Sequence, residues 1–136
     1  MKRHVFRALV LLACIVVSSY AGTPDDNAKA ALQGKWQAIE ATSNGEPPPP
    51  GMLEKLTLVF RGDTVSIMAA PPTRFTLDTS VTPPRIDILN SRHQVGIYEL
   101  KDSILRVCFG MDGDRPQAFR TRPHTDHTYM KLQRVQ

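Results

Sequence analysis

The chain has 136 residues, of which 41% are hydrophobic and 22% charged, and it carries 17 basic and 13 acidic side chains. This length suits one compact domain and excludes an enzyme built from separate cofactor and substrate domains. The formal net charge of +4 would favour nucleic-acid binding if the basic residues lay in the folded domain. Their distribution along the chain therefore has to be considered.

Residues 1–21 have the layout of a secretory signal peptide. Three basic residues precede an apolar run over residues 8–17, and the small residues Ser19 and Ala21 mark a cleavage site after position 21. The run is shorter than the ~20 residues that a membrane-spanning helix needs. We therefore expect an exported protein, periplasmic or extracellular.

One alternative places the protein at a membrane. Leu11-Leu12-Ala13-Cys14 resembles a lipobox, in which Cys14 would be lipidated and become the new N-terminus. The apolar run continues beyond Cys14 through residues 15–17, where a lipoprotein normally turns polar, and this favours simple cleavage. A membrane partner is expected only if Cys14 is lipidated.

Removal of the leader changes both the charge and the cysteine count. The leader contains three of the 17 basic residues and no acidic one, so the mature chain has 14 basic and 13 acidic side chains and a net charge of +1. A nucleic-acid partner is therefore not expected. Cleavage also leaves Cys108 without a partner for an intrachain disulfide. We expect Cys108 to be a buried small apolar residue, the alternative being a reactive or intermolecular thiol.

The mature chain begins with a short polar stretch. Residues 22–32 predict a tether with one helical turn at most, and the domain proper is expected over residues 33–136. From there short alternating segments are separated by turn residues, which is typical of an all-β sandwich or barrel.

The clearest element is a hairpin over residues 56–68, in which Leu56, Leu58 and Phe60 share one face of the first strand and Gly62-Asp63 forms the turn. The same alternation, with proline pairs as breaks, predicts further strands over residues 36–42, 75–77, 86–88, 95–100, 104–109 and 128–134. About eight antiparallel strands in ~100 residues predict a small closed barrel, whose interior is either filled by side chains or holds one small ligand.

The order of several motifs along the domain is similar to that of a known family. In chain order the motifs are Leu32-Gln33-Gly34-Lys35-Trp36, Phe60-Arg61-Gly62-Asp63, Ile86-Asp87, Gly96-Ile97-Tyr98-Glu99-Leu100, Leu105-Arg106-Val107-Cys108-Phe109, Arg115-Pro116, Phe119 and Lys131-Leu132-Gln133-Arg134. This series resembles an uncharacterised lipocalin-like domain family abundant in planctomycete bacteria. The resemblance covers residues 32–134 and implies a lipocalin-like antiparallel β-barrel.

The resemblance also implies how the barrel is closed. In lipocalins the tryptophan of a Gly-x-Trp element in the first strand closes the barrel floor, and a basic residue near the end of the chain packs across it; Trp36 and Arg134 match these positions. This chain departs from the family pattern in two places. Lys101-Asp102-Ser103 lacks the usual glycine, which implies a different turn type, and Pro47 to Pro50 stiffens the first connection.

Strand alternation predicts which side chains face the interior, although one β-bulge would invert a strand. The interior candidates, which would contact a ligand, are Leu58, Phe60, Val65, Ile67, Phe75, Ile97, Leu105, Val107 and Phe109. A basic cluster of Arg115, Arg120 and Arg122 before the last strand would orient an anionic head group at the barrel mouth. The alternative is a solvated loop whose arginines pair with Asp112 and Asp114.

Motifs for metal binding and catalysis are weak in this sequence. His124 and His127 have no helical context and no nearby cysteine or glutamate pair, so no metal and no cofactor are expected. Neither a nucleophile elbow nor an activated cysteine occurs, so we expect no enzyme activity and no catalytic residue.

The sequence therefore predicts an exported lipocalin-like protein that binds a small apolar or amphipathic ligand noncovalently in its barrel. The competing class is a filled barrel that acts as an interaction or inhibitor module. Such a module would have a protein of the cell envelope as its partner and no small-molecule ligand.

Overall fold

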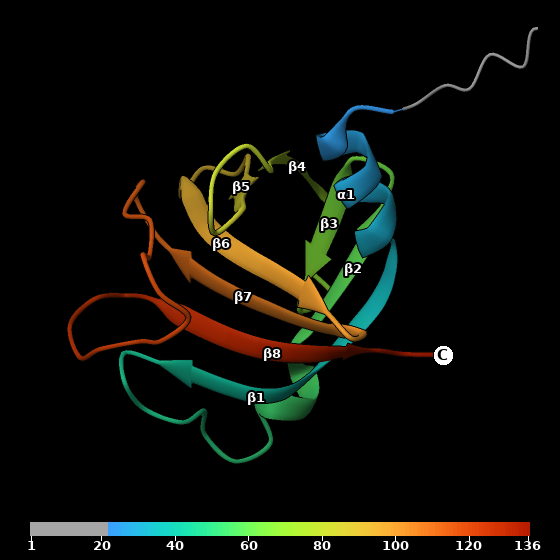
Figure 1. Cartoon of the computed structure of the whole chain (residues 1–136). Helices are drawn as coiled ribbons and strands as arrows, with labels where there is room; N and C mark the ends of the chain where they lie inside the picture. The colour runs from blue at the N-terminus through green and yellow to red at the C-terminus, as the bar shows by residue number, and fades with distance from the viewer. Residues whose placement is uncertain (1–21) are drawn as a thin grey trace, which may run out of the picture.

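The computed structural model describes residues 22–136, which form one closed β-barrel with one short α-helix (Figure 1). Eight antiparallel strands each pair with the next, and the last returns to the first. The predicted fold class, an all-β lipocalin-like barrel, is confirmed. The strands are β1 (Gly34–Ser43), β2 (Thr57–Arg61), β3 (Thr64–Ile67), β4 (Thr73–Asp78), β5 (Arg85–Ile88), β6 (Gln94–Lys101), β7 (Ile104–Gly110) and β8 (Thr128–Arg134).

The leader expected over residues 1–21, including Cys14, lies outside the described residues. Within residues 22–136, no helix is both long enough and apolar enough to span a bilayer. The cleavage site and the alternative lipid anchor therefore remain predictions of the sequence.

The hairpin predicted over residues 56–68 is formed by β2 and β3. Leu58 pairs with Ile67 and Phe60 pairs with Val65, so the apolar residues of both strands meet on one face. That face is the inside of the barrel, where most of these side chains belong to one continuous buried cluster. The same alternation repeats in the other strands and produces the core.

The hairpin between β6 and β7 has a tight turn. Lys101 pairs with Ile104, so the turn consists of only Asp102 and Ser103. Their φ angles are 52° and 64°, and positive φ at both central residues is the property of a type I′ turn, which normally favours Asn-Gly. Two non-glycine residues therefore occupy the positive-φ positions of this turn. Whether its type differs from that of the family stays a prediction.

The segment predicted to be a tether is a docked helix, α1 (Pro24–Leu32). Thr23 caps its N-terminus, because its Oγ1 accepts a hydrogen bond from the backbone N of Asp26 at 3.1 Å. A proline in the first turn also favours helix initiation at this point. On the barrel side, Asp25 accepts hydrogen bonds from the backbone N and the Oγ1 of Thr79 at 2.9 and 2.6 Å. The helix is thereby fixed to the connection between β4 and β5.

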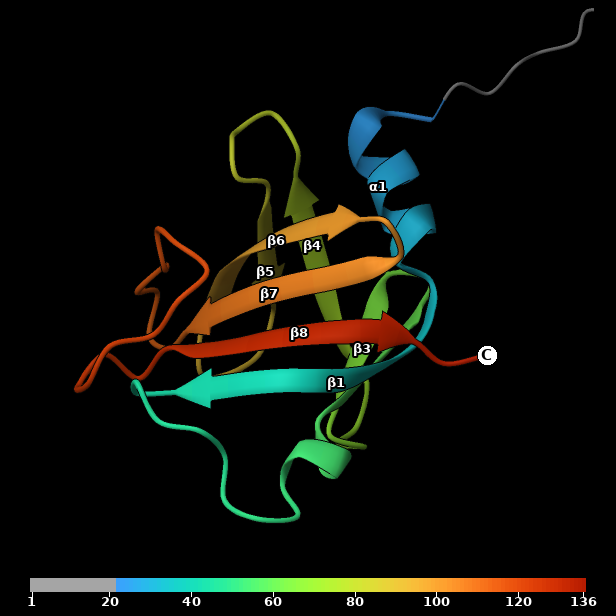
Figure 2. The ribbon, with the colours of Figure 1, turned by 60° about the horizontal axis from the view of Figure 1, so that its bottom comes forward.

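The two ends of the barrel have different surroundings. Every connection reverses the chain, so alternate connections meet at the same end. Figure 2 shows α1 and the C-terminus at one end of β6, β7 and β8, and the connection between β7 and β8 at the other. The end away from α1 is bordered by residues 44–56, which include the 3-10 helix η1 (Leu53–Lys55), and by residues 68–72, 89–93 and 111–127.

Candidate ligand site at the barrel mouth

The α1 end of the barrel is closed by Trp36 and Arg134. The indole of Trp36 is fully buried, and its Nε1 donates a hydrogen bond to the carbonyl of Leu32 at 2.8 Å. The guanidinium of Arg134 lies over the indole ring, with Cζ 4.3 Å from the ring centroid. Arg134 also donates to the carbonyls of Ala31 (2.8 Å) and Gln33. The contact that the family resemblance implied is therefore present.

The barrel above this closed end is filled by side chains. Phe60 and Phe75 are each 1% exposed and meet edge to face, with ring centroids 5.1 Å apart. Leu58 and Leu105 are fully buried beside them. This part of the barrel is a packed core of buried apolar side chains.

The opposite end of the barrel carries an open depression. A cavity of about 340 Å³, which we call the cup, opens between the connections that border this end. Inward residues of β3, β5, β7 and β8 form its apolar floor, namely Val65, Ile67, Ile88, Phe109 and Met130. Ile67 is partly exposed there, whereas the other four are at most 3% exposed and belong to the packed core. The packed core and this depression therefore lie at opposite ends of the same barrel.

A few polar side chains lie at the edge of the cup. Asn90 and Gln94 are joined by two hydrogen bonds of 3.2 Å, one between their side chains and one from the backbone N of Gln94 to Asn90 Oδ1. Arg92 lies between them in the sequence and lines the cup as well. Within residues 22–136 Arg92 forms no ion pair. Among the described residues, the cup thus combines an apolar floor with the free cationic group of Arg92, which is the arrangement of many small-molecule sites.

Sequence reasoning missed these three residues although a signal for them existed. In a barrel whose strands simply alternate in direction, residues 68–72, 89–93 and 111–127 must all emerge at one end. Counting the connections would have placed Arg92 at the same end as the loop that precedes the last strand. The prediction instead relied on the density of arginines.

The predicted interior residues lie inside the barrel, with one exception. Val65, Ile67 and Phe109 line the cup, and those in the packed part below it are Leu58, Phe60, Phe75, Leu105 and Val107. Ile97 instead belongs to a cluster on the outer face. In β6 the inward residue beside Ile97 is Tyr98, which joins the main core. The apolar character of Ile97 therefore led to the wrong face of β6.

The three predicted head-group arginines do not meet at the cup. Arg115 donates to Asp87 (2.6 Å) and to the carbonyl of Gly96 (2.7 Å), which locks it against β5 and β6. Arg120 and Arg122 are exposed and line a separate depression formed by residues 114–127. Arg115 lines that depression as well, so the three arginines lie together but not at the cup, and their predicted placement at the barrel mouth was wrong. Arg115 pairs with neither Asp112 nor Asp114.

Cys108 is buried on the outer face of β7. With Ile97 and Tyr129 it forms a small cluster that Phe119 covers from the connection between β7 and β8. Burial raises the pKa of the Cys108 thiol to about 11, and the thiol donates a 3.6 Å hydrogen bond to the carbonyl of Arg120. The expectation of a buried cysteine is confirmed, and such a thiol is a poor nucleophile.

Arg106 fastens the same connection to the barrel. Its guanidinium lies 4.7 Å from the ring centroid of Phe119 and 5.8 Å from that of Tyr129. It also donates to the Tyr129 hydroxyl at 3.2 Å and contacts Glu99 at 3.5 Å. The segment after β7 is thus held on the outside of the barrel by aromatic and charged contacts.

The two C-terminal histidines have separate surroundings. His127 Nε2 lies 3.0 Å from Asp114 Oδ2, whereas His124 is exposed. The backbone N of Asp126, between them, donates to Asn44 at 2.6 Å. Within residues 22–136 no three acidic, histidine or cysteine side chains come together as a metal site would require.

The strand order, the floor closed by Trp36 and Arg134, and the open cup define the class of this protein: a closed antiparallel β-barrel of the lipocalin-like type. Comparisons with protein-family models, curated proteins and solved structures find no match to the chain. Its function has to be argued from the cup itself.

Proposed function

We propose that this is an exported, lipocalin-like protein that binds one small apolar or amphipathic molecule noncovalently in the cup. The observation that carries the proposal is the apolar cavity of about 340 Å³ that opens at the barrel mouth above a packed floor. Sites for small molecules typically measure ~300 to 1,000 Å³ and have mainly apolar walls. The cup lies at the small end of that range, so its ligand is small.

The polar edge of the cup supports an amphipathic ligand. Arg92 is the exposed cation there, and Asn90 and Gln94 supply hydrogen-bonding groups next to it. An apolar tail would pack against Ile67 and Phe109, while a polar or anionic end would remain near Arg92. This division of the wall favours orientation of the ligand by its polar end.

Binding without chemistry is part of the proposal. The most reactive type of side chain in the domain, the thiol of Cys108, lies on the outer face of β7, away from the cup. Its raised pKa keeps it protonated at neutral pH. The cup wall itself offers mainly aliphatic and aromatic groups, which suit a binding protein.

A second candidate function rests on exposed apolar residues at the same end. Met68 and Leu89 are 43% and 56% exposed, and both lie in connections that border the cup. Exposed large apolar side chains are a feature of protein-binding surfaces. In this alternative the barrel is an interaction or inhibitor module for a protein of the cell envelope.

The test compares two matched substitutions on β4. Thr73 lines the cup, whereas Thr76 is exposed on the outer face of the same strand. Thr73→Phe should fill the cup and weaken binding of N-phenyl-1-naphthylamine, a neutral apolar fluorescent probe, by roughly tenfold or more. Thr76→Phe adds the same ring outside the barrel and should bind the probe like the parent protein.

Protein purified from its host provides an independent measurement. Native mass spectrometry before and after organic extraction should reveal a stoichiometric small molecule that extraction removes. Thr128→Phe fills the cup from the opposite wall and replaces Thr73→Phe if circular dichroism shows that the latter is unfolded. A barrel that binds no probe, carries no extractable molecule and copurifies with a protein would support the interaction module instead.

A further inference from the structure

The connection between β7 and β8 carries a second depression, separate from the cup. It has a volume of about 290 Å³ and is lined by residues 114–127, including Arg120, Arg122 and His127. Among the described residues, none lines both this depression and the cup. We call it the arginine depression. Binding of a ligand in the cup therefore does not account for the arginine depression.

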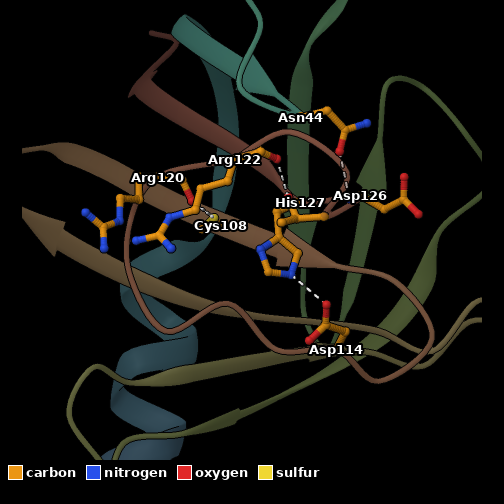
Figure 3. Close-up of polar contacts among 8 residues, drawn as sticks. Asn44, Cys108, Asp114, Arg120, Arg122, Asp126 and His127 are labelled. Atoms are coloured by element: carbon orange, nitrogen blue, oxygen red, sulfur yellow. Dashed lines mark hydrogen bonds and ion pairs between the residues drawn. The ribbon is translucent and has the colours of Figure 1, made fainter.

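The side chains of Arg120 and Arg122 reach this depression together. Thr121, which separates them, is turned toward β1: its Oγ1 accepts from the backbone N of Gly45 (2.9 Å) and donates to Thr42 Oγ1 (3.0 Å). Figure 3 shows both guanidinium groups on the same side of the His127 ring, with that of Arg122 between Arg120 and the ring. Two planar cationic forks thus border one hollow.

The backbone that carries these arginines is fixed at several points. The carbonyl of Arg120 accepts from the thiol of Cys108, and the carbonyl of Arg122 accepts from Thr125 Oγ1 at 2.6 Å. Farther along, Asn44 joins the connection to β1, because its backbone N donates to the carbonyl of His127 at 3.1 Å. A ligand would therefore meet a largely preformed backbone, which lowers the entropic cost of binding.

The charges of the depression are not balanced internally. Its carboxylate, that of Asp114, lies 3.0 Å from His127 (Figure 3), and Arg115 is occupied by Asp87. Within the part of the chain that the structure describes, Arg120 and Arg122 form no ion pair. Two exposed guanidinium groups therefore remain available to an anion from solution.

We propose that the arginine depression is an oxyanion site, in which Arg120 and Arg122 bind a phosphate or sulfate group independently of the cup. Guanidinium groups suit such anions because their paired N–H donors match two oxygen atoms at once. The anion is either free phosphate or sulfate or the phosphate of a lipid head group, since both present the same oxygen atoms. In neither case does the site need the barrel interior.

The test measures binding of inorganic phosphate to the mature protein by isothermal titration calorimetry. Arg120→Gln/Arg122→Gln should weaken the affinity at least roughly tenfold. Arg61→Gln/Lys101→Gln removes the same charge from the closed end of the barrel and should leave the affinity unchanged. Arg120→Lys/Arg122→Lys keeps the charge but loses the paired donors, so its affinity should fall as well.

Vesicles containing phosphatidylglycerol distinguish the two sources of the anion. Saturable binding of inorganic phosphate identifies a site for the free anion, and binding that appears only with vesicles identifies a lipid head group. The proposal is overturned if neither probe binds saturably, or if the closed-end control weakens binding as much as the double arginine variant. Thr73→Phe should leave phosphate binding unchanged, because Thr73 lines only the cup. The proposed ligand site in the cup and the proposed oxyanion site are therefore tested separately.

Discussion

The guanidinium of Arg134 lies 4.3 Å from the centroid of the buried Trp36 ring, so the last residue of β8 covers the third residue of β1. The same guanidinium donates hydrogen bonds to the carbonyls of Ala31 and Gln33 at the end of α1. One side chain thereby connects the helix, the first strand and the last strand.

Loss of Arg134 should destabilise the barrel. Arg134→Gln removes the cation from the indole face and its paired hydrogen bonds, and we expect the free energy of unfolding to fall by about 1 to 2 kcal/mol. Trp36→Ala removes a fully buried indole and should cost about 3 to 5 kcal/mol. Urea denaturation followed by circular dichroism measures both changes.

Arg61→Gln is the matched control for Arg134→Gln. Arg61 is exposed at the end of β2 and forms no ion pair among residues 22–136, so its loss should change stability by no more than about 0.5 kcal/mol. Equal unfolding free energies for the two variants would contradict a structural role of the stacked pair.

Cys108 should make the stability of the protein depend on alkaline pH. Burial raises its pKa from 9.0 to about 11, so the folded state resists ionisation of a thiol that the unfolded chain ionises freely. The resulting stabilisation is fully present below pH 9 and is lost as the pH rises toward 11. We expect a loss of roughly 1 to 2 kcal/mol over this range, measured by urea denaturation at successive pH values.

The comparison variant for this measurement is Cys108→Ala. Burial also raises the pKa of Tyr98, so some alkaline destabilisation will remain in any variant that keeps this tyrosine. The difference between the parent protein and Cys108→Ala should therefore shrink between pH 9 and 11. A constant difference would show that the thiol ionises equally well in the folded and unfolded states.

The strands could be predicted from the sequence because apolar residues alternate along their inner face, although Ile97, Cys108 and Tyr129 are also buried on the outer face. β8 has the predicted bounds, Thr128–Arg134. β7 was predicted over residues 104–109 and ends one residue later, at Gly110.

Which face of β6 points inward could not be deduced in the same way. The outward residues Val95 and Ile97 are more hydrophobic than the inward residues Gly96 and Tyr98. Gly96 is close to the ring of Phe109: a Cβ there would lie 2.7 Å from Phe109 Cδ1. Packing of β6 against β7 therefore determines which residues of β6 point inward, and the alternation of residues along one strand contains no information on this packing.

The helix and the arginines failed as predictions for different reasons. α1 was predicted only as one helical turn in a tether, although Thr23 and the acidic residues Asp25 and Asp26 form an ordinary helix start. The positions of Arg120 and Arg122 depend on the path of the connection between β7 and β8. Three contacts fix that path: Thr121 binds Thr42 of β1, Phe119 packs against Arg106, and Cys108 of β7 donates to the carbonyl of Arg120. Contacts of this kind between distant segments leave no periodic signal in the sequence.

Arg92 should select among ligands of the cup by the charge of their polar end. In competition with N-phenyl-1-naphthylamine at pH 7, Arg92→Gln should weaken the binding of octanoate about two- to fivefold, because an exposed ion pair contributes ~0.2 to 1 kcal/mol. Binding of octanol, which has the same chain length but no charge, should not change. Arg61→Gln at the closed end removes the same charge far from the cup and should affect neither ligand. If Arg61→Gln weakens octanoate as much as Arg92→Gln does, the effect comes from overall charge, and Arg92 does not orient the ligand.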